Sequence, residues 1–160
     1  MSASSTEENL ANAQQLICGA VYLRDGIDED GSTRNMASPA LAGLIIEFFY
    51  TGSSAVGVLF PEVFGREVPK ATVALAGTAL RGAIDEYATT GVRQDRHFEY
   101  TWYSKVFTHL MLMQAMIDTN PKHAAKTQAL RIAWATTGSE ALNHSGNMVA
   151  FEDDFEVILN

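Results

Sequence analysis

The chain has 160 residues, 47% of them apolar and 19% charged, which is typical of one compact globular domain and unlike a disordered chain. Its formal net charge of −8 argues against general binding to a nucleic-acid backbone, because such binding needs clustered lysine and arginine. The one cysteine, Cys18, excludes a disulfide within the chain and fits a reducing compartment.

The charge is distributed unevenly. Residues 1–64 sum to −6 and residues 138–160 to −5, whereas residues 65–137 carry nine basic and six acidic side chains, a net charge of +3. The first residues show neither the basic nor the apolar part of a signal peptide, and no apolar run reaches the about 20 residues of a membrane helix. We therefore expect a cytoplasmic or nuclear protein with no membrane contact.

The first helix is predicted over residues 6–23, because a capping-box pattern precedes apolar residues at three- and four-residue steps. A polar, glycine-bearing loop follows at residues 24–35. It superficially resembles a calcium loop, but with Gly31 at the glycine position the first and last ligands would fall on Gly26 and Ala37. Neither residue supplies a carboxylate, so we interpret the segment as a solvated loop.

A second helix is predicted to begin at Ser38 and Pro39, where serine serves as the cap and proline occupies the first helical position. Its buried stripe is predicted to contain five apolar residues: Leu41, Leu44, Ile45, Phe48 and Phe49. A short helical turn follows, and then a loop at residues 62–68 in which Val63 and Phe64 are predicted to fill the core.

Pro69 opens the next predicted helix, which runs to about residue 89. Small residues on this helix, among them Gly77 and Gly82, predict that another helix approaches closely. Glycine costs up to about 1 kcal/mol inside a helix, so Gly77 is expected to have a packing role. Residues 92–102 are predicted to form a charged connector held by aromatic side chains.

The most apolar segment is residues 104–118, whose apolar side chains point in almost every direction around a helix. A helix of this kind is usually buried on all sides. A last helix is predicted at residues 121–137 and is ended by Gly138, and no stretch shows the period-two alternation of a strand. The sequence therefore predicts an all-α fold, a compact bundle of five to six helices around a buried central helix at about 104–118. The helical domain is predicted to span residues 1–138, followed by an acidic, apolar C-terminal tail at residues 139–160.

Five segments fall in the order and at the spacing of a known domain: LIIEFFY at 44–50, FPEVFG at 60–65, VAL at 73–75, ALRGAIDEY at 79–87 and TGVR at 90–93. In these segments the chain resembles an uncharacterised domain family of basidiomycete fungi, and the resemblance covers roughly residues 15–140. It implies a mostly helical domain of unknown function and brings no catalytic residue with it. The chain departs from the family pattern because it lacks long polar arms and adds the acidic tail.

The histidines are candidates for acid–base or metal chemistry. His109 lies in the most apolar part of the chain, so it is either a general base or metal ligand tuned by burial, or a core histidine satisfied by one hydrogen bond. We favour the core role. His97, His123 and His144 have no partner at metal-ligand spacing, and the chain has no cysteine pair, so we expect no metal and no cofactor.

Asp85 and Glu86 close a predicted helix that meets the loop of His97, and paired carboxylates near a histidine can perform acid–base catalysis. Arg81 lies one turn from Asp85, so an ion-paired helix surface also explains these residues, and we favour it. The sequence contains no nucleophile elbow, phosphate-binding loop or dinucleotide motif. These observations favour a protein that is not an enzyme.

The C-terminal tail combines large apolar side chains with carboxylates. Its predicted anchors are five apolar residues: Phe151, Phe155, Val157, Ile158 and Leu159. Four carboxylates lie among them and complement the positive middle segment, where Arg93 and Arg96 are the predicted contacts. We therefore predict a non-enzymatic helical interaction module that forms a homo-oligomer, with the tail docked on a neighbouring copy.

Two alternatives stay open. The first is a small-molecule-binding enzyme that uses His109 or His97 with Asp85 or Glu86, and a deep pocket containing His109 would support it. The second is a nucleic-acid accessory domain that uses basic side chains of the middle segment: Arg66, Lys70, Arg81, Arg93 and Arg96. A mass above that of the monomer without binding to nucleic acid would support the interaction module.

Overall fold

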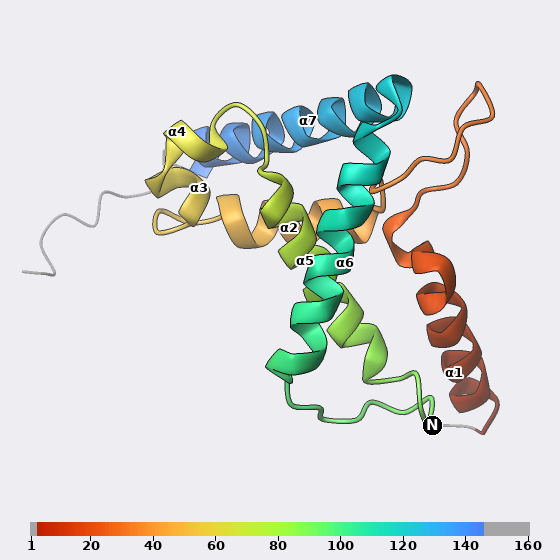
Figure 1. The fold of residues 1–160 in the computed structure, drawn as a ribbon. Coiled ribbons are helices and arrows are strands. Elements are labelled where there is room, and N and C mark those ends of the chain that lie inside the picture. The colour runs from red at the N-terminus through yellow and green to blue at the C-terminus, as the bar shows by residue number, and fades with distance from the viewer. Residues whose placement is uncertain (1–2, 146–160) are drawn as a thin grey trace, which may run out of the picture.

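The computed structural model describes residues 3–145 of the chain (Figure 1). Over these residues the chain forms seven α-helices and one 3-10 segment, and the predicted all-α class is confirmed. Their bounds in chain order are α1 Ala3–Ile17, η1 Cys18–Leu23, α2 Pro39–Tyr50, α3 Val56–Leu59, α4 Pro61–Phe64, α5 Lys70–Asp85, α6 Tyr100–Asp118 and α7 Pro121–Ser145. The short helix α4 lies where a loop is predicted, because its proline suits the first turn of a helix.

Two pairs of helices form the body of the molecule. α5 packs along α6, α2 packs along α7, and α2 also contacts α5. In Figure 1 the α2–α7 pair runs across the α5–α6 pair, while α1 stands to one side and contacts α5. The core lies between these elements, and its most deeply buried side chains are Leu23, Leu41, Ile45, Tyr50 and Val68.

α2 and α7 are in close contact at Gly138, a buried residue inside α7. A Cβ atom at this position would lie 2.3 Å from Tyr50 Cγ, far inside van der Waals contact. Tyr50 is 1% exposed and its hydroxyl donates a 2.9 Å hydrogen bond to the Phe64 carbonyl oxygen, so the ring has little room to move. The prediction that Gly138 ends the helix is wrong, because this glycine makes space for a neighbouring ring and α7 continues to Ser145.

The close approach predicted at Gly77 is confirmed. A Cβ atom at this position in α5 would lie 2.9 Å from Leu110 Cδ1 of α6 and 3.2 Å from Leu23 Cδ2 of η1. All three residues are buried. The missing side chain of Gly77 therefore allows α5, α6 and η1 to meet in the core.

The prediction that the helix at 104–118 is buried on all sides is wrong. α6 begins at Tyr100, and its buried residues are Tyr103, Leu110 and Gln114, which share one face. Leu112 and Met116 are 56% and 71% exposed. α6 packs against α5 and α7 on one side only, so part of its apolar surface faces outward. Its other apolar residues are partly buried against the core: Val106, Phe107, Met111, Met113 and Ile117. Neither α6 nor any other helix within residues 3–145 is long and apolar enough to cross a membrane.

The predicted first helix is divided into α1 and η1. Gly19 and Ala20 have φ angles of 60° and 57°, which lie in the left-handed region. A right-handed helix cannot continue through two residues in this conformation. The chain therefore changes direction after α1, and Tyr22 and Leu23 become part of the core.

Replacing Gly138 with alanine should destabilise the fold by about 1–3 kcal/mol, because the new methyl group would overlap the Tyr50 ring. This cost should exceed the about 1 kcal/mol by which alanine favours a helix over glycine. Gly43 in α2 is the matched control, since it is exposed and nothing lies within 4 Å of its Cβ position. Gly43→Ala should therefore stabilise the chain. Urea unfolding measures both effects, and a Gly138→Ala variant as stable as the wild type would contradict the close contact.

Candidate functional site

The segment between α5 and α6, together with the first turn of α6, presents exposed aromatic and basic side chains. We define the connector surface by five residues: Arg93, Arg96, Phe98, Tyr100 and Trp102. Tyr100 is 84%, Phe98 60% and Trp102 48% exposed. Clustered exposed apolar surface commonly marks a site of interaction. The connector surface is therefore the first candidate for contact with a partner.

Contacts with α5 and α6 hold the aromatic rings of the connector surface. The Phe98 ring stacks on Tyr103 with the two centroids 4.1 Å apart and an interplanar angle of 9°. The Arg81 guanidinium carbon lies 6.0 Å from the centroid of the Trp102 ring, at the outer range of a cation–π contact. The Phe98 and Trp102 rings are thus partly ordered before a partner binds. This order reduces the loss of side-chain conformational entropy on binding.

The arginines of the connector surface fold back on the end of α5. Arg93 Nε donates a 2.8 Å hydrogen bond to Glu86 Oε2, and this bond raises the pKa of Arg93. Arg96 Nη2 donates a 2.5 Å hydrogen bond to Thr89 Oγ1. The Arg93 side chain is nevertheless 72% exposed, so a partner can reach it, although Glu86 partly neutralises its charge.

Asp85 supports the connector surface from inside the molecule. It is 6% exposed and accepts hydrogen bonds from Arg81 Nε at 2.8 Å and from the Tyr103 hydroxyl at 3.3 Å. Burial, followed by the nearby Asp85 carboxylate, raises the pKa of Tyr103. Glu86 instead pairs with Arg93, so the two carboxylates of the enzyme hypothesis have different partners, and Asp85 forms the ion pair with Arg81 that the sequence favours.

The two histidines of the enzyme hypothesis lie in different places. His109 is exposed on α6, and its ring Nδ1 lies 2.8 Å from the Lys105 carbonyl oxygen. Its predicted position in the core is wrong, because the packing of α6 leaves that face uncovered. His97 lines an open depression of about 350 Å³ together with Tyr103. Tyr103 is a hydrogen-bond partner of Asp85, so His97, and not His109, lies in the same depression as a partner of Asp85.

Ion pairs tie the polar loop after η1 to the start of α7. Lys126 pairs with Asp28 and Asp30, and Lys122 Nζ lies 2.7 Å from Asp30 Oδ2. Hydrogen bonds to Asp28 and then to Asp30 raise the pKa of Lys126. Lysine thus neutralises the carboxylates that a calcium ion would need. Residues 3–145 contain no cluster of three or more histidine, cysteine, aspartate or glutamate side chains that could hold a metal ion.

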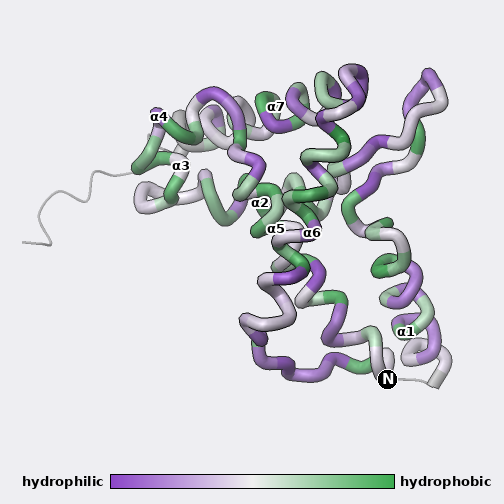
Figure 2. The backbone as a smooth tube through the Cα atoms, in the orientation of Figure 1, coloured by the Kyte–Doolittle hydropathy of each residue, from purple (hydrophilic) through white to green (hydrophobic). Residues whose placement is uncertain are grey.

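A second exposed apolar surface lies at the α3–α4 end of the molecule. We define the α3–α4 patch by four residues: Phe48, Leu59, Phe60 and Val63. Their side chains are between 49% and 66% exposed. The predictions that Phe48 and Val63 lie in the core are wrong, because Phe49 and Phe64 face inward instead and stack with centroids 6.0 Å apart. Figure 2 shows hydrophobic segments in α3 and α4, beside the end of α7.

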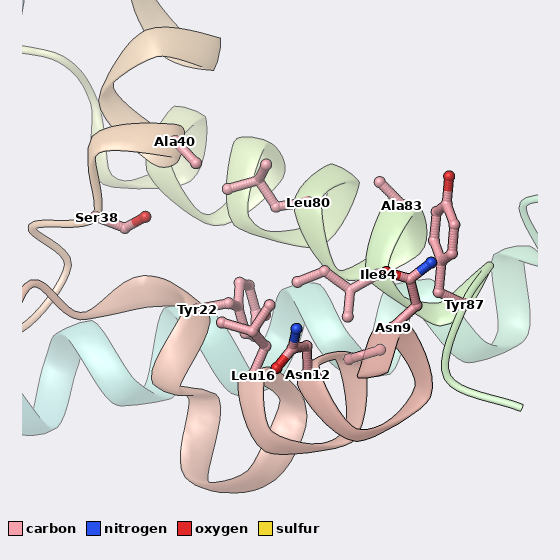
Figure 3. Close-up of a pocket in the computed structure, with 11 residues that line it drawn as sticks. Asn9, Asn12, Leu16, Tyr22, Ser38, Ala40, Leu80, Ala83, Ile84 and Tyr87 are labelled. Carbon is pink, nitrogen blue, oxygen red and sulfur yellow. The ribbon is translucent and has the colours of Figure 1, made fainter. Parts of the chain in front are cut away.

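A groove of about 430 Å³ opens between α1 and the α2–α5 side of the body (Figure 3). Its apolar walls include Leu16 of α1 and Leu80 and Ile84 of α5. Asn9 Nδ2 donates a 3.3 Å hydrogen bond to the Gly91 carbonyl oxygen, which joins α1 to the turn after α5 at one end of the groove. None of the residues that line the groove is charged.

Two hydroxyl groups belong to buried residues of the groove. Tyr22 and Ser38 are each 6% exposed, and burial raises the pKa of Tyr22 to about 12. Neither hydroxyl makes a hydrogen bond within the described part of the chain. Ser38 is the predicted cap of α2, but its side chain forms no cap hydrogen bond to this helix. The groove itself has no sequence signal, because its walls come from four separate segments.

The basic residues of the nucleic-acid alternative are largely paired with carboxylates. The pairs are Lys70 with Asp118, Arg81 with Asp85, and Arg93 with Glu86. Three of the five predicted phosphate contacts thus already have an anionic partner. Their positive charge is correspondingly less available to a nucleic-acid backbone.

The described residues form an all-α domain with two exposed apolar surfaces and one uncharged groove. The chain belongs to the family defined as Domain of unknown function (DUF6532), whose profile matches residues 1–117. This finding confirms the resemblance to an uncharacterised domain. The match ends within α6, so α7 lies outside it even though α7 packs along α2. No curated protein and no solved structure matches the chain.

Replacing Tyr22 with phenylalanine should reduce the loss of stability at high pH. An unfolded tyrosine ionises near pH 10, whereas Tyr22 in the folded chain retains its proton to about pH 12, so its contribution is complete below pH 10 and is lost as the pH rises towards 12. The slope of unfolding free energy against pH should become shallower by about 1 kcal/mol per pH unit in Tyr22→Phe. Tyr50, whose pKa is also raised to about 12 by burial, should preserve part of the slope. Identical slopes for wild type and variant would contradict the burial of the Tyr22 hydroxyl.

Proposed function

We propose that the protein is a non-enzymatic interaction module that self-associates, with the C-terminal tail of one copy docked on the connector surface of another. The observation that carries the proposal is the exposure of three aromatic rings beside two arginines on one short segment. Such a surface suits a partner that combines apolar side chains with carboxylates. The tail of the same chain has this composition.

The chemistry of the tail complements the connector surface in two ways. Its apolar anchors lie outside the described residues: Phe151, Phe155, Val157, Ile158 and Leu159. Contact with the exposed rings would remove their apolar surface from water, at about 25 cal/mol per Å². The four carboxylates among the anchors would face Arg93 and Arg96. Charge pairs of this kind accelerate and orient association more than they strengthen it.

The position of the end of α7 favours docking on a second copy. In Figure 1 α7 ends beside α3 and α4, on the opposite side of the molecule from the segment between α5 and α6. A tail that docked on its own connector surface would have to run back along the whole body. Exchange between two copies avoids this path and gives each copy one donor and one acceptor site.

The α3–α4 patch lies nearer to the end of α7, so it is the competing site for a tail that docks on its own chain. Its elements α2 and α4 carry exposed carboxylates, Glu47 and Glu62, against one cation in the following loop, Arg66. This local charge is unfavourable for an acidic tail. The connector segment carries its two arginines against two exposed carboxylates, Asp95 and Glu99, so its local charge is balanced and less unfavourable for an acidic tail.

The enzyme alternative has weaker support. His97 and Tyr103 share an open depression, but Asp85 is buried and already hydrogen-bonded to Arg81 and Tyr103. Acid–base catalysis requires a carboxylate or histidine within reach of a substrate, and Asp85 is not accessible. The hydrogen bonds of Asp85 are explained by a structural role, because they hold Arg81 and Tyr103 beneath the connector surface.

Deleting residues 149–160 should lower the association state and leave the helix content nearly unchanged, because α7 ends before the deleted segment. Light scattering after size exclusion, at several concentrations, measures the mass, and circular dichroism measures the helix content. A truncated chain that retains the full-length mass but melts at a lower temperature would show that the tail binds its own chain, and would contradict the proposal.

A charge substitution on the connector surface gives a second, matched test. Tyr100→Glu places a carboxylate where the acidic tail is proposed to dock, so it should reduce association at least tenfold. Met116→Glu is the control, because Met116 is 71% exposed on the same helix but lies near its other end. Equal association of the two variants would contradict the assignment. An oligonucleotide that binds at low salt, and loses binding in Tyr100→Glu, would instead assign the surface to nucleic acid.

A further inference from the structure

The groove beside α1 has the properties of a small-molecule site. Its volume of about 430 Å³ lies within the usual range of about 300–1,000 Å³ for such sites. We propose that it binds one neutral, mainly apolar molecule of about two fused rings that carries a hydroxyl or carbonyl group at one end. This site is separate from the connector surface and does not depend on self-association.

The absence of charge in the lining selects a neutral ligand. An ionised ligand would lose hydration on entering the groove and would find no counter-charge there. Tyr22 of the groove interacts electrostatically with Arg81 and Asp85, and these two residues neutralise each other through a 2.8 Å ion pair. Apolar contact with Leu16, Leu80 and Ile84 would supply most of the affinity.

Ser38 gives the groove its polar end. Ser38 is only 6% exposed and lines the groove. Its hydroxyl makes no hydrogen bond within residues 3–145. A serine at a helix N-cap usually accepts a hydrogen bond from the backbone N–H two or three residues on, but here it does not. Figure 3 shows its oxygen pointing towards Leu80 and Ala40 across the groove. A ligand hydroxyl or carbonyl placed there would pair with it.

The shape of the groove favours a small molecule over a peptide helix. The hydrogen bond from Asn9 to Gly91 joins α1 to the turn after α5, so the groove is closed at that end. A docked helix with its side chains is about 10–12 Å wide and needs a channel that is open at both ends. A compact two-ring molecule does not.

The test uses the full-length chain and the neutral fluorescent probe N-phenyl-1-naphthylamine. Saturable binding of one probe per chain is expected. Ala83 is exposed in the free chain and lines the groove, so Ala83→Trp should fill the space and weaken binding at least tenfold. Ala79→Trp is the matched control, because Ala79 is exposed one turn earlier on α5 and does not line the groove. The affinity of Ala79→Trp for the probe should stay within about twofold of the wild type, because a surface substitution away from the groove has little effect. Both variants add the same side chain, so a difference between them reports the position of the tryptophan.

Competition against the probe tests the polar end. 2-Naphthol should displace the probe at several-fold lower concentration than naphthalene, and Ser38→Ala should remove this preference while naphthalene binding is unchanged. Circular dichroism checks that each variant is folded. Binding that does not saturate, equal effects of Ala83→Trp and Ala79→Trp, or an unchanged preference in Ser38→Ala would each overturn the proposal.

Discussion

The architecture depends on close contacts between helices at two glycines, Gly138 and Gly77. Gly138 receives the Tyr50 ring between α7 and α2, and Gly77 receives Leu110 and Leu23 where α5, α6 and η1 meet. An added methyl group at Gly138 would overlap the Tyr50 ring, whereas at Gly77 it would meet the ends of two leucine side chains, which can shift at lower cost. Because these contacts fix the two helix pairs, they also fix where the connector surface, the α3–α4 patch and the groove lie. The surfaces with proposed functions are thus consequences of the same packing.

A small bundle with two tightly packed pairs covers its helices incompletely. α6 is shielded by α5 and α7 on one side, so Leu112 and Met116 face outward, and α1 stands apart enough to leave an open groove. Two of the three exposed rings of the connector surface contact Tyr103 and Arg81, and Asp85 accepts a hydrogen bond from each of these two residues. A buried polar network that orients exposed rings is more easily explained by recognition than by catalysis.

Local signals in the sequence predict most of the helices, and long-range packing explains the errors. Pro39 and Pro121 mark helix starts because proline suits the first turn, and Gly77 indicates a close contact because glycine inside a helix is costly. Gly138 is also a glycine inside a helix, but its position after a run of apolar residues favours a helix end. Its contact, Tyr50, is 88 residues away along the chain, so no local pattern predicts their proximity. The burial of α6, and with it that of His109, depends on how many helices surround α6. A local sequence pattern does not predict this number. The groove combines four separate segments, so Ser38 is recognisable as a cap but not as a polar group in a cavity.

The central claim is that the tail of one copy contacts the connector surface of another. It is tested most directly by nuclear magnetic resonance on a mixture of ¹⁵N-labelled chain without residues 149–160 and unlabelled full-length Tyr100→Glu chain. In this mixture the labelled chain has an acceptor surface but no tail, and the unlabelled chain has a tail but an impaired surface. The labelled amide resonances of residues 93–102 should shift, and the shifts should saturate, as the unlabelled chain is added. Unchanged resonances in that segment, or shifts confined to the α3–α4 patch, would contradict it.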